Sequence, residues 1–240
     1  YPLIADSLTA DEAILDAELV KSVPPAITAD TGMDVFTHAL ESYVSTQHNE
    51  FSAALAEKAV EICGEFLLRA YLDGSDMHAR QKMHVASCLA GLSFNTAGLG
   101  ITHSMAHQLG AMFHIPHGRA NAMLLPHIVE FNSDINKHSK SKEVYLPAVH
   151  RYANIAHILG LNNYNPVMTV RSLVNWIQFM QKEMNIPLTI QEIGTVTPDE
   201  YFGAIDKMAD AALADACTST NPRVPTKEDI MKIYKKLWSF

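Results

Sequence analysis

Apolar positions along most of this chain recur at the three-to-four-residue spacing of an amphipathic helix. Residues 24–44 begin with two prolines, which a first helical turn tolerates, and carry an apolar stripe to their end. Residues 52–70 are rich in strong helix formers, and Gly74 follows them as a stop signal. The pattern therefore predicts two long helices in the first third of the chain.

Residues 77–94 carry a stripe of small side chains, which lets neighbouring helices approach closely. We therefore expect a third helix that is buried at the centre of the fold. Periodic apolar positions return in four later segments, residues 144–159, 167–184, 198–214 and 227–238. Only residues 13–16 are typical of a strand. With about eight to ten predicted helices, the expected fold class is mainly α.

The composition fits one globular domain with a sizeable core. The chain has 240 residues, of which 48% are hydrophobic and 18% charged. No repeat or low-complexity linker divides it. We expect residues 1–22 to be a residual interdomain segment and residues 23–240 to form a single all-helical domain.

Net charge and cysteine content limit the classes of binding partner and the cellular compartments to be expected. The formal net charge is −8 and basic residues do not cluster, so nucleic acid is not expected as a partner. Three cysteines without a CxxC spacing indicate a reducing compartment. No apolar run is long enough for a membrane span. We expect a cytoplasmic protein, and a first residue other than Met suggests a chain cut from a longer one.

Candidate chemistry is concentrated in two segments. Residues 103–118 contain four histidines, and imidazole is the commonest metal ligand in proteins. Upstream, Asp34 and His38 are four residues apart, which places them on one face of the predicted helix. This combination of carboxylate and imidazoles predicts a metal site.

Spacing alone leaves the ligands of this site open. In a continuous helix, His103 and His117 would lie about 21 Å apart, at about 1.5 Å per residue. Pro116 disfavours such continuity, so one helix should end near residues 113–115 and the next begin near His117. That reversal could bring His103 and His117 together. By spacing, however, His103 and His107 are the more obvious chelating pair.

Three motifs resemble the iron-containing (group III) alcohol dehydrogenases. They are Gly32-x-Asp34-x-x-x-His38-Ala39-x-Glu41, His103-x-x-Ala106-His107-x-x-Gly110 followed by Pro116-His117-Gly118, and Cys217-Thr218-x-Thr220-Asn221-Pro222-Arg223. The resemblance covers essentially the whole chain. It implies the helical-bundle C-terminal domain of the dehydroquinate synthase-like, iron-containing alcohol dehydrogenase fold.

The resemblance also implies roles for individual residues. It assigns the metal ligands to Asp34, His38, His103 and His117, and places His107 beside the nicotinamide as a catalytic and cofactor-contacting residue. The expected ion is Fe²⁺, with Zn²⁺ as a competitor because these ligands suit both. The implied reaction is NAD-dependent interconversion of small primary alcohols and aldehydes, in a homo-oligomer. The pattern is most similar to the propanol and ethanol dehydrogenases of propanediol and ethanolamine utilisation.

One part of the family pattern is missing. An N-terminal α/β domain that binds NAD through a glycine-rich loop is absent, and residues 95–100 follow no predicted strand. We therefore interpret that segment as a close-packing bend. The fragment should hold metal but bind NAD poorly, and catalysis would need the N-terminal domain.

Some roles and functions stay open. Glu41 could accept a hydrogen bond from His38 or be a solvated helix residue, and His114 could line a pocket or face solvent. One alternative function is a non-catalytic metal-binding and assembly module of a bifunctional aldehyde-alcohol dehydrogenase. Another is a metal-dependent hydrolase, although no His-Glu-x-x-His motif is present.

Overall fold

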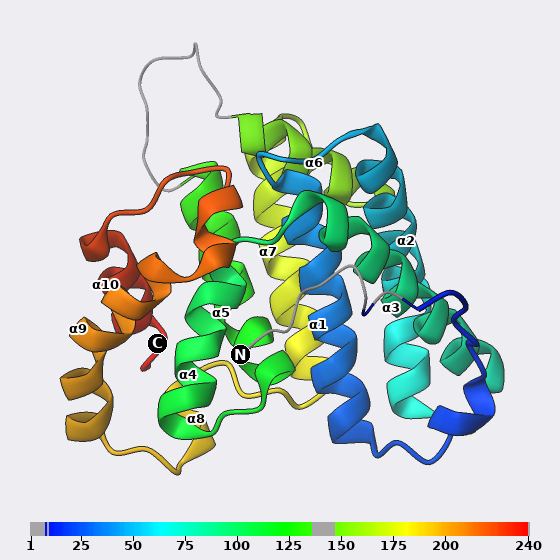
Figure 1. The fold of residues 1–240 in the computed structure, drawn as a ribbon, viewed down its shortest axis with the longest axis horizontal. Helices are drawn as coiled ribbons and strands as arrows, with labels where there is room; N and C mark the ends of the chain where they lie inside the picture. Colours follow the sequence, from blue (N-terminus) through cyan, green and yellow to red (C-terminus); the bar gives the residue numbers. More distant parts are fainter. Residues whose placement is uncertain (1–7, 9, 136–146, 240) are drawn as a thin grey trace.

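The computed structural model describes residue 8 and residues 10–135 and 147–239. Over these residues the chain forms ten α-helices, short 3-10 helices and no strand (Figure 1). The mainly α fold class is therefore confirmed. The α-helices are α1 Pro25–Val44, α2 Glu50–Leu72, α3 Met77–Ala97, α4 Ile101–Phe113, α5 His117–Ser133, α6 Pro147–Ile158, α7 Pro166–Glu183, α8 Ile190–Ile193, α9 Pro198–Ala214 and α10 Lys227–Lys236, and the 3-10 helices are η2 Ala17–Val20 and η3 Ala216–Thr220.

Local sequence signals account for most helix boundaries. Prolines occupy the first turn of α1, α7 and α9, where their missing N–H costs nothing. Capping boxes open α2, α9 and α10, each built from a polar N-cap and a polar residue three positions later. The predicted helices agree within a few residues, although residues 144–146 lie outside the described part of the chain.

The prediction of a strand at residues 13–16 is wrong. This segment is extended but has no partner strand among the described residues, and Ile14 is 83% exposed. Gln81 of α3 fixes it instead, because its side chain donates to the carbonyl of Leu15 and accepts from the backbone N–H of Ala17. A β-strand needs backbone hydrogen bonds to a neighbouring strand. Without such a neighbour, the apolar residues of this segment do not indicate a sheet.

Two hydrophobic cores share α5. One core is built from α1, α2, α3, α6 and α7, and the other from α4, α8, α9 and α10. Leu125 and Val129 of α5 belong to the first core, whereas Leu124 and Ile128 belong to the second. Figure 1 shows the consequence, with α9 and α10 on one side of α5 and α2 and α3 on the other.

The small-residue stripe does not make α3 central. Ala86, Ala90 and Ser93 are buried, but Leu92 on the same helix is 54% exposed. Small side chains let α3 approach α1 and α2 on one face only, and the central helix is α5 instead. Within the described residues no single helix is long and apolar enough to cross a membrane, and α3 and α4 meet that test only as a pair bent by 107°.

Candidate metal centre

Helix α1 supplies two side chains of the predicted site. Asp34 and His38 are one turn apart on α1, and both side chains are 19% exposed. The Nδ1 atom of His38 lies 3.9 Å from the Oδ2 atom of Asp34. The i, i+4 spacing therefore places carboxylate and imidazole together, as the sequence predicts.

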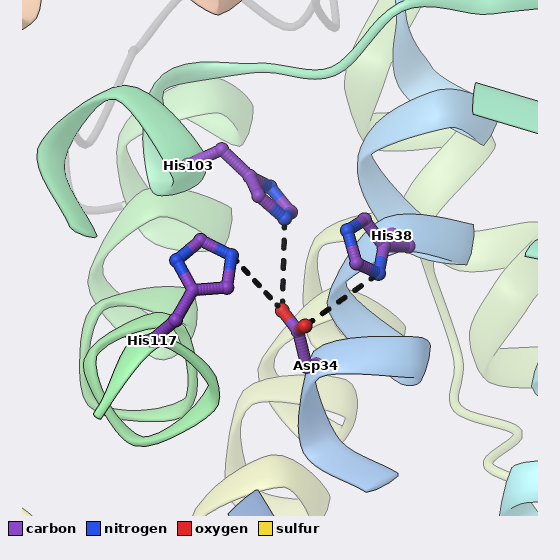
Figure 2. Close-up of side chains that lie close together, drawn as sticks. All are labelled: Asp34, His38, His103 and His117. Atoms are coloured by element: carbon purple, nitrogen blue, oxygen red, sulfur yellow. Dashed lines mark ion pairs between the residues drawn. The ribbon is translucent and has the colours of Figure 1, made fainter. Parts of the chain in front are cut away.

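The turn between α4 and α5 brings two further histidines to α1. His114 ends α4 in the left-handed conformation, and Pro116 is the N-cap of α5. The chain thereby reverses, and His103 of α4 and His117 of α5 face the same carboxylate (Figure 2). Their Nε2 atoms lie 3.7 Å and 3.6 Å from the Oδ1 atom of Asp34.

The four side chains form one cluster. One ligand atom from each of Asp34, His38, His103 and His117 lies within 4.8 Å of all the others. Of the two histidine pairings that spacing left open, the structure brings His103 to His117 at this carboxylate and leaves His107 outside the cluster. His107 lies beside it, with its ring stacked on that of His117 at 5.4 Å between centroids.

A divalent ion fits this cluster. The Nε2 atom of His103 is buried and has no hydrogen-bond partner among the described residues. An orphaned buried nitrogen of this kind is costly unless a ligand occupies it. One carboxylate and three imidazoles form a donor set that suits Fe²⁺ and Zn²⁺ alike.

The charge state of the cluster also suits a cation. Burial raises the pKa of Asp34, but the imidazoles of His103, His38 and His117 close to its carboxylate outweigh this and lower the pKa to about 2. Burial lowers the pKa of His38 to about 4, which keeps a lone pair on its ring. For His103, burial lowers the pKa, but Asp34 and Glu41 raise it to about 9. Asp34 and Glu41 thus favour a positive charge at His103. A metal ion at the Nε2 atom can supply that charge in place of a second proton.

Glu41 has a different partner from either one expected. It is neither solvated nor bound to His38; it is only 2% exposed and lies 2.7 Å from the Nδ1 atom of His103. It also accepts hydrogen bonds from the backbone N–H groups of Gly100 and Thr102 at the start of α4. The spacing after His38 places Glu41 near that face of α1, but could not identify a partner 62 residues away.

Asn121 also belongs to the site, although it was not predicted from the sequence. Its Nδ2 atom donates to the Oδ1 atom of Asp34 at 2.7 Å and lies 3.0 Å from the Nε2 atom of His117. Asn121 is fully buried, and its Oδ1 atom has no hydrogen-bond partner in the part of the chain that the structure describes. It follows His117 by four residues, so the helical period was the signal that could have identified it.

A second group of polar side chains adjoins the cluster. The Nδ1 atom of His107 is 2.8 Å from the Oδ2 atom of Asp215, whose Oδ1 atom accepts from the backbone N–H of Cys217. This contact leaves the Nε2 atom of His107 free of Asp215. Cys217 is only partly buried and lies next to this pair. His114 is exposed at the end of α4, as the solvent-facing interpretation requires.

The glycine-containing segment before α4 packs closely. Gly98 has a φ of 72°, and a Cβ atom there would lie 2.9 Å from the Oγ1 atom of Thr220. A Cβ atom on Gly100 would lie 2.7 Å from the Oε1 atom of Glu41. Both contacts support the interpretation of residues 95–100 as a close-packing bend.

Comparisons with known proteins agree with one another. The model described as "Fe-containing alcohol dehydrogenase family, C-terminal" matches residues 28–238. Over 98% of its length the chain is 42% identical to the NADPH-dependent butanol dehydrogenase of Clostridium saccharobutylicum, and over 99% it is 43% identical to the 1-propanol dehydrogenase PduQ of Citrobacter freundii. It spans 57% and 62% of those two proteins. A crystal structure of a 1,3-propanediol oxidoreductase superposes with a TM-score of 0.83 and 34% identity, over 93% of this chain and 55% of that one.

Proposed function

The chain belongs to the Fe-containing alcohol dehydrogenase family, and from this premise we propose that it is the metal-binding part of an NAD-dependent alcohol dehydrogenase. The observation that carries the proposal is the buried, unpartnered Nε2 atom of His103, which faces Asp34. His38 and His117 complete the set of donors around that carboxylate. Family membership favours Fe²⁺ as the ion, and the donor set also admits Zn²⁺.

The proposed reaction needs a metal-binding group and a group that transfers a proton. When bound, a divalent ion supplies Lewis-acid chemistry to an alcohol or aldehyde oxygen. Asp34 and three neutral imidazoles would hold the ion, and ion and ligands together would carry a net charge of about +1, which favours an electron-rich oxygen as a further ligand. His107, oriented by Asp215 through its Nδ1 atom, is placed to hold or release a proton at Nε2.

The proposed substrates are small primary alcohols and the corresponding aldehydes. The support comes from two relatives, a butanol dehydrogenase and a 1-propanol dehydrogenase. The chain spans about three fifths of those proteins, so nicotinamide binding is proposed for the complete gene product.

Metal content tests the proposal first. We expect about one equivalent of iron or zinc, by mass spectrometry, in chain purified without oxygen. Asp34→Ala and His117→Ala should both lose it. His157→Ala is a matched control, because His157 is an exposed histidine on α6 outside the cluster. A folded wild-type chain without metal would refute the claim that these residues hold an ion by themselves.

Activity of the complete gene product tests the reaction. Alcohol-dependent reduction of NAD should be abolished by His103→Ala. Asp215→Asn should retain the metal and lower kcat by at least about tenfold, because His107 loses its fixed orientation. Asp210→Asn is the control, since that exposed carboxylate on α9 pairs only with Lys227 among the described contacts. An assembly module would show no alcohol-dependent reduction, and a hydrolase would turn over without nicotinamide.

A further inference from the structure

We propose that Glu41 is the positioning residue that fixes the tautomer of His103 and so creates the vacant nitrogen of the metal centre. The inference rests on the proposed function, because it concerns the same four-ligand cluster. It starts from the hydrogen bonds that Glu41 accepts within the buried start of α4.

The surroundings of Glu41 demand a carboxylate. Its Oε2 atom lies 2.9 Å from the backbone nitrogen of Gly100 and 2.7 Å from the Nδ1 atom of His103, and its Oε1 atom lies 2.7 Å from the backbone nitrogen of Thr102. All three partners are donors in this arrangement. An ionised carboxylate is acceptor-only and can satisfy all of them. Burial raises the pKa of Glu41, but the contacts with His103 and Thr102 outweigh this and lower it.

The acceptor determines where the ring proton of His103 resides. A neutral imidazole carries one N–H, and a carboxylate can only accept from it. Glu41 therefore keeps the first ring proton on Nδ1, so Nε2 is the nitrogen whose lone pair an ion can take in place of a second proton. That Nε2 atom is the buried, unpartnered one that faces Asp34. Glu41 thus makes the Nε2 atom of His103 available as a metal ligand without being a ligand itself.

Glu41 also places the helix that carries His103. It lies on α1 one turn beyond His38, and it binds the first free N–H groups of α4. One carboxylate consequently sets both the ring orientation of His103 and the approach of α4 to α1. Gly100 is required at this contact, because a Cβ atom would lie 2.7 Å from the Oε1 atom of Glu41.

Counting Glu41 changes the charge of the centre. Asp34 and Glu41 together carry two negative charges, which a divalent ion neutralises. No lysine or arginine is among the described hydrogen-bond partners of Glu41. A neutral buried assembly costs less desolvation free energy than a charged one, so the Glu41 carboxylate favours retention of the ion.

The variant Glu41→Gln tests this role with almost no change of shape. An amide has one acceptor oxygen and one NH₂ donor. If its oxygen faces Thr102, its NH₂ group faces His103 and pushes the ring proton to Nε2. If its oxygen faces His103, its NH₂ group opposes the N–H of Thr102. We expect metal affinity, measured by chelator competition, to fall by about 10–100-fold.

Asp229→Asn is the matched control. Asp229 is the capping-box carboxylate of α10 and accepts from the backbone N–H and hydroxyl of Thr226, away from the cluster. Like Glu41→Gln, this variant loses a carboxylate that accepts hydrogen bonds at the start of a helix. It therefore shows how much the loss of helix capping alone changes the metal affinity. Its metal affinity and its Co²⁺ absorption spectrum should match wild type, whereas Glu41→Gln should alter both.

A measurement on wild type covers the case in which Glu41→Gln does not fold. Histidine ¹⁵N NMR of the Zn²⁺-loaded chain should show His103 protonated at Nδ1 and metal-bound at Nε2. The reverse assignment overturns the proposal, as does unchanged metal affinity in a folded Glu41→Gln variant, and in either case the four-ligand centre stands. Absence of metal from wild type overturns the proposed function itself.

Discussion

Asn121 holds two members of the cluster at once. Its single NH₂ group reaches the Oδ1 atom of Asp34 on α1 and the Nε2 atom of His117 on its own helix. Removing it leaves the Asp34 carboxylate free to turn away from the other ligands. We therefore expect Asn121→Ala to weaken metal binding by about tenfold or more, measured by chelator competition.

Asn132→Ala separates this effect from lost packing. Asn132 is also buried on α5, but it bonds to Tyr152 and Asn221 rather than to the cluster. Both variants should lower the free energy of unfolding, since each leaves buried partners unsatisfied. Only Asn121→Ala should change metal affinity, and equal affinities in the two variants would remove Asn121 from the site.

His127 gives the fold a pH dependence unrelated to the metal. Burial, with a smaller effect of Lys236, lowers its pKa to about 4. The unfolded chain, with an ordinary pKa of about 6.5, binds that proton more tightly, so the stabilisation is present above pH 6.5 and is lost as the pH falls towards 4. Between pH 7 and pH 5 we expect a loss of about 2 kcal/mol in unfolding free energy.

Urea unfolding in EDTA measures this loss. The variant His127→Gln lacks the titrating ring, so its unfolding free energy should fall less between the two pH values. Parallel pH profiles of wild type and His127→Gln would show that His127 does not contribute.

Residue-level chemistry was predictable where it follows the helical period. Asp34 and His38 could be paired from their spacing, and Asn121 lies at the same interval from His117. The family resemblance, which the matched relatives confirm, was needed to choose between His107 and His117. The partners of Glu41 and Asp215 are fixed by tertiary packing across 62 and 108 residues, and no local pattern encodes them.

At the scale of elements, the crossing of α1 and α5 depends on Gly118. A Cβ atom at Gly118 would overlap the backbone carbonyl of Asp30 and approach the Cβ atom of Asp34 to 3.2 Å. The backbone of Asp30 cannot move aside as a flexible side chain could, so Gly118→Ala must push the two helices apart. We expect a loss of about 1–3 kcal/mol in unfolding free energy, together with weaker metal binding, because His117 moves with α5.

Gly91→Ala is the comparison for this substitution. A Cβ atom on Gly91 would have no described neighbour within 4 Å, although Gly91 also lies inside a helix. Alanine has the higher helix propensity, so this variant should gain up to about 1 kcal/mol. Chemical unfolding and chelator competition on both variants measure the contrast, and a neutral Gly118→Ala would argue against close contact of the helices.

Elements with strong periodicity and caps were predictable, and the others were not. The boundary between α4 and α5 follows from Pro116 because proline acts locally on its neighbours. The four-residue helix α8 is too short to show a period, and it was missed. The position of α3 at the side of the fold depends on which helices pack on it, and a stripe of small residues does not encode that choice.

Across the whole molecule, the two cores are interleaved along the chain. Helices α1 to α3 enter the first core, α4 enters the second, α6 and α7 return to the first, and α8 to α10 complete the second. The metal cluster lies where they meet, since α1 belongs to the first core and α4 to the second. A bound ion therefore ties both cores together.

Metal removal should destabilise the whole molecule. An ion that binds only the folded state adds about 4 kcal/mol when its free concentration is a thousand times Kd. We expect EDTA to lower the unfolding temperature of wild type and of His157→Ala, followed by circular dichroism. Asp34→Ala should not respond, and a wild-type chain indifferent to EDTA would show that the ion does not join the cores.

The distance along the chain between the ligands also has a consequence for biosynthesis. A ribosome releases Asp34 and His38 long before His103 and His117 have been made. The early pair alone is a weak chelator that any abundant metal can enter and leave. Tight capture must wait until α4 and α5 have been translated and packed against α1. Selection of the metal is therefore postponed until the second pair of ligands has left the ribosome and both pairs can surround one ion.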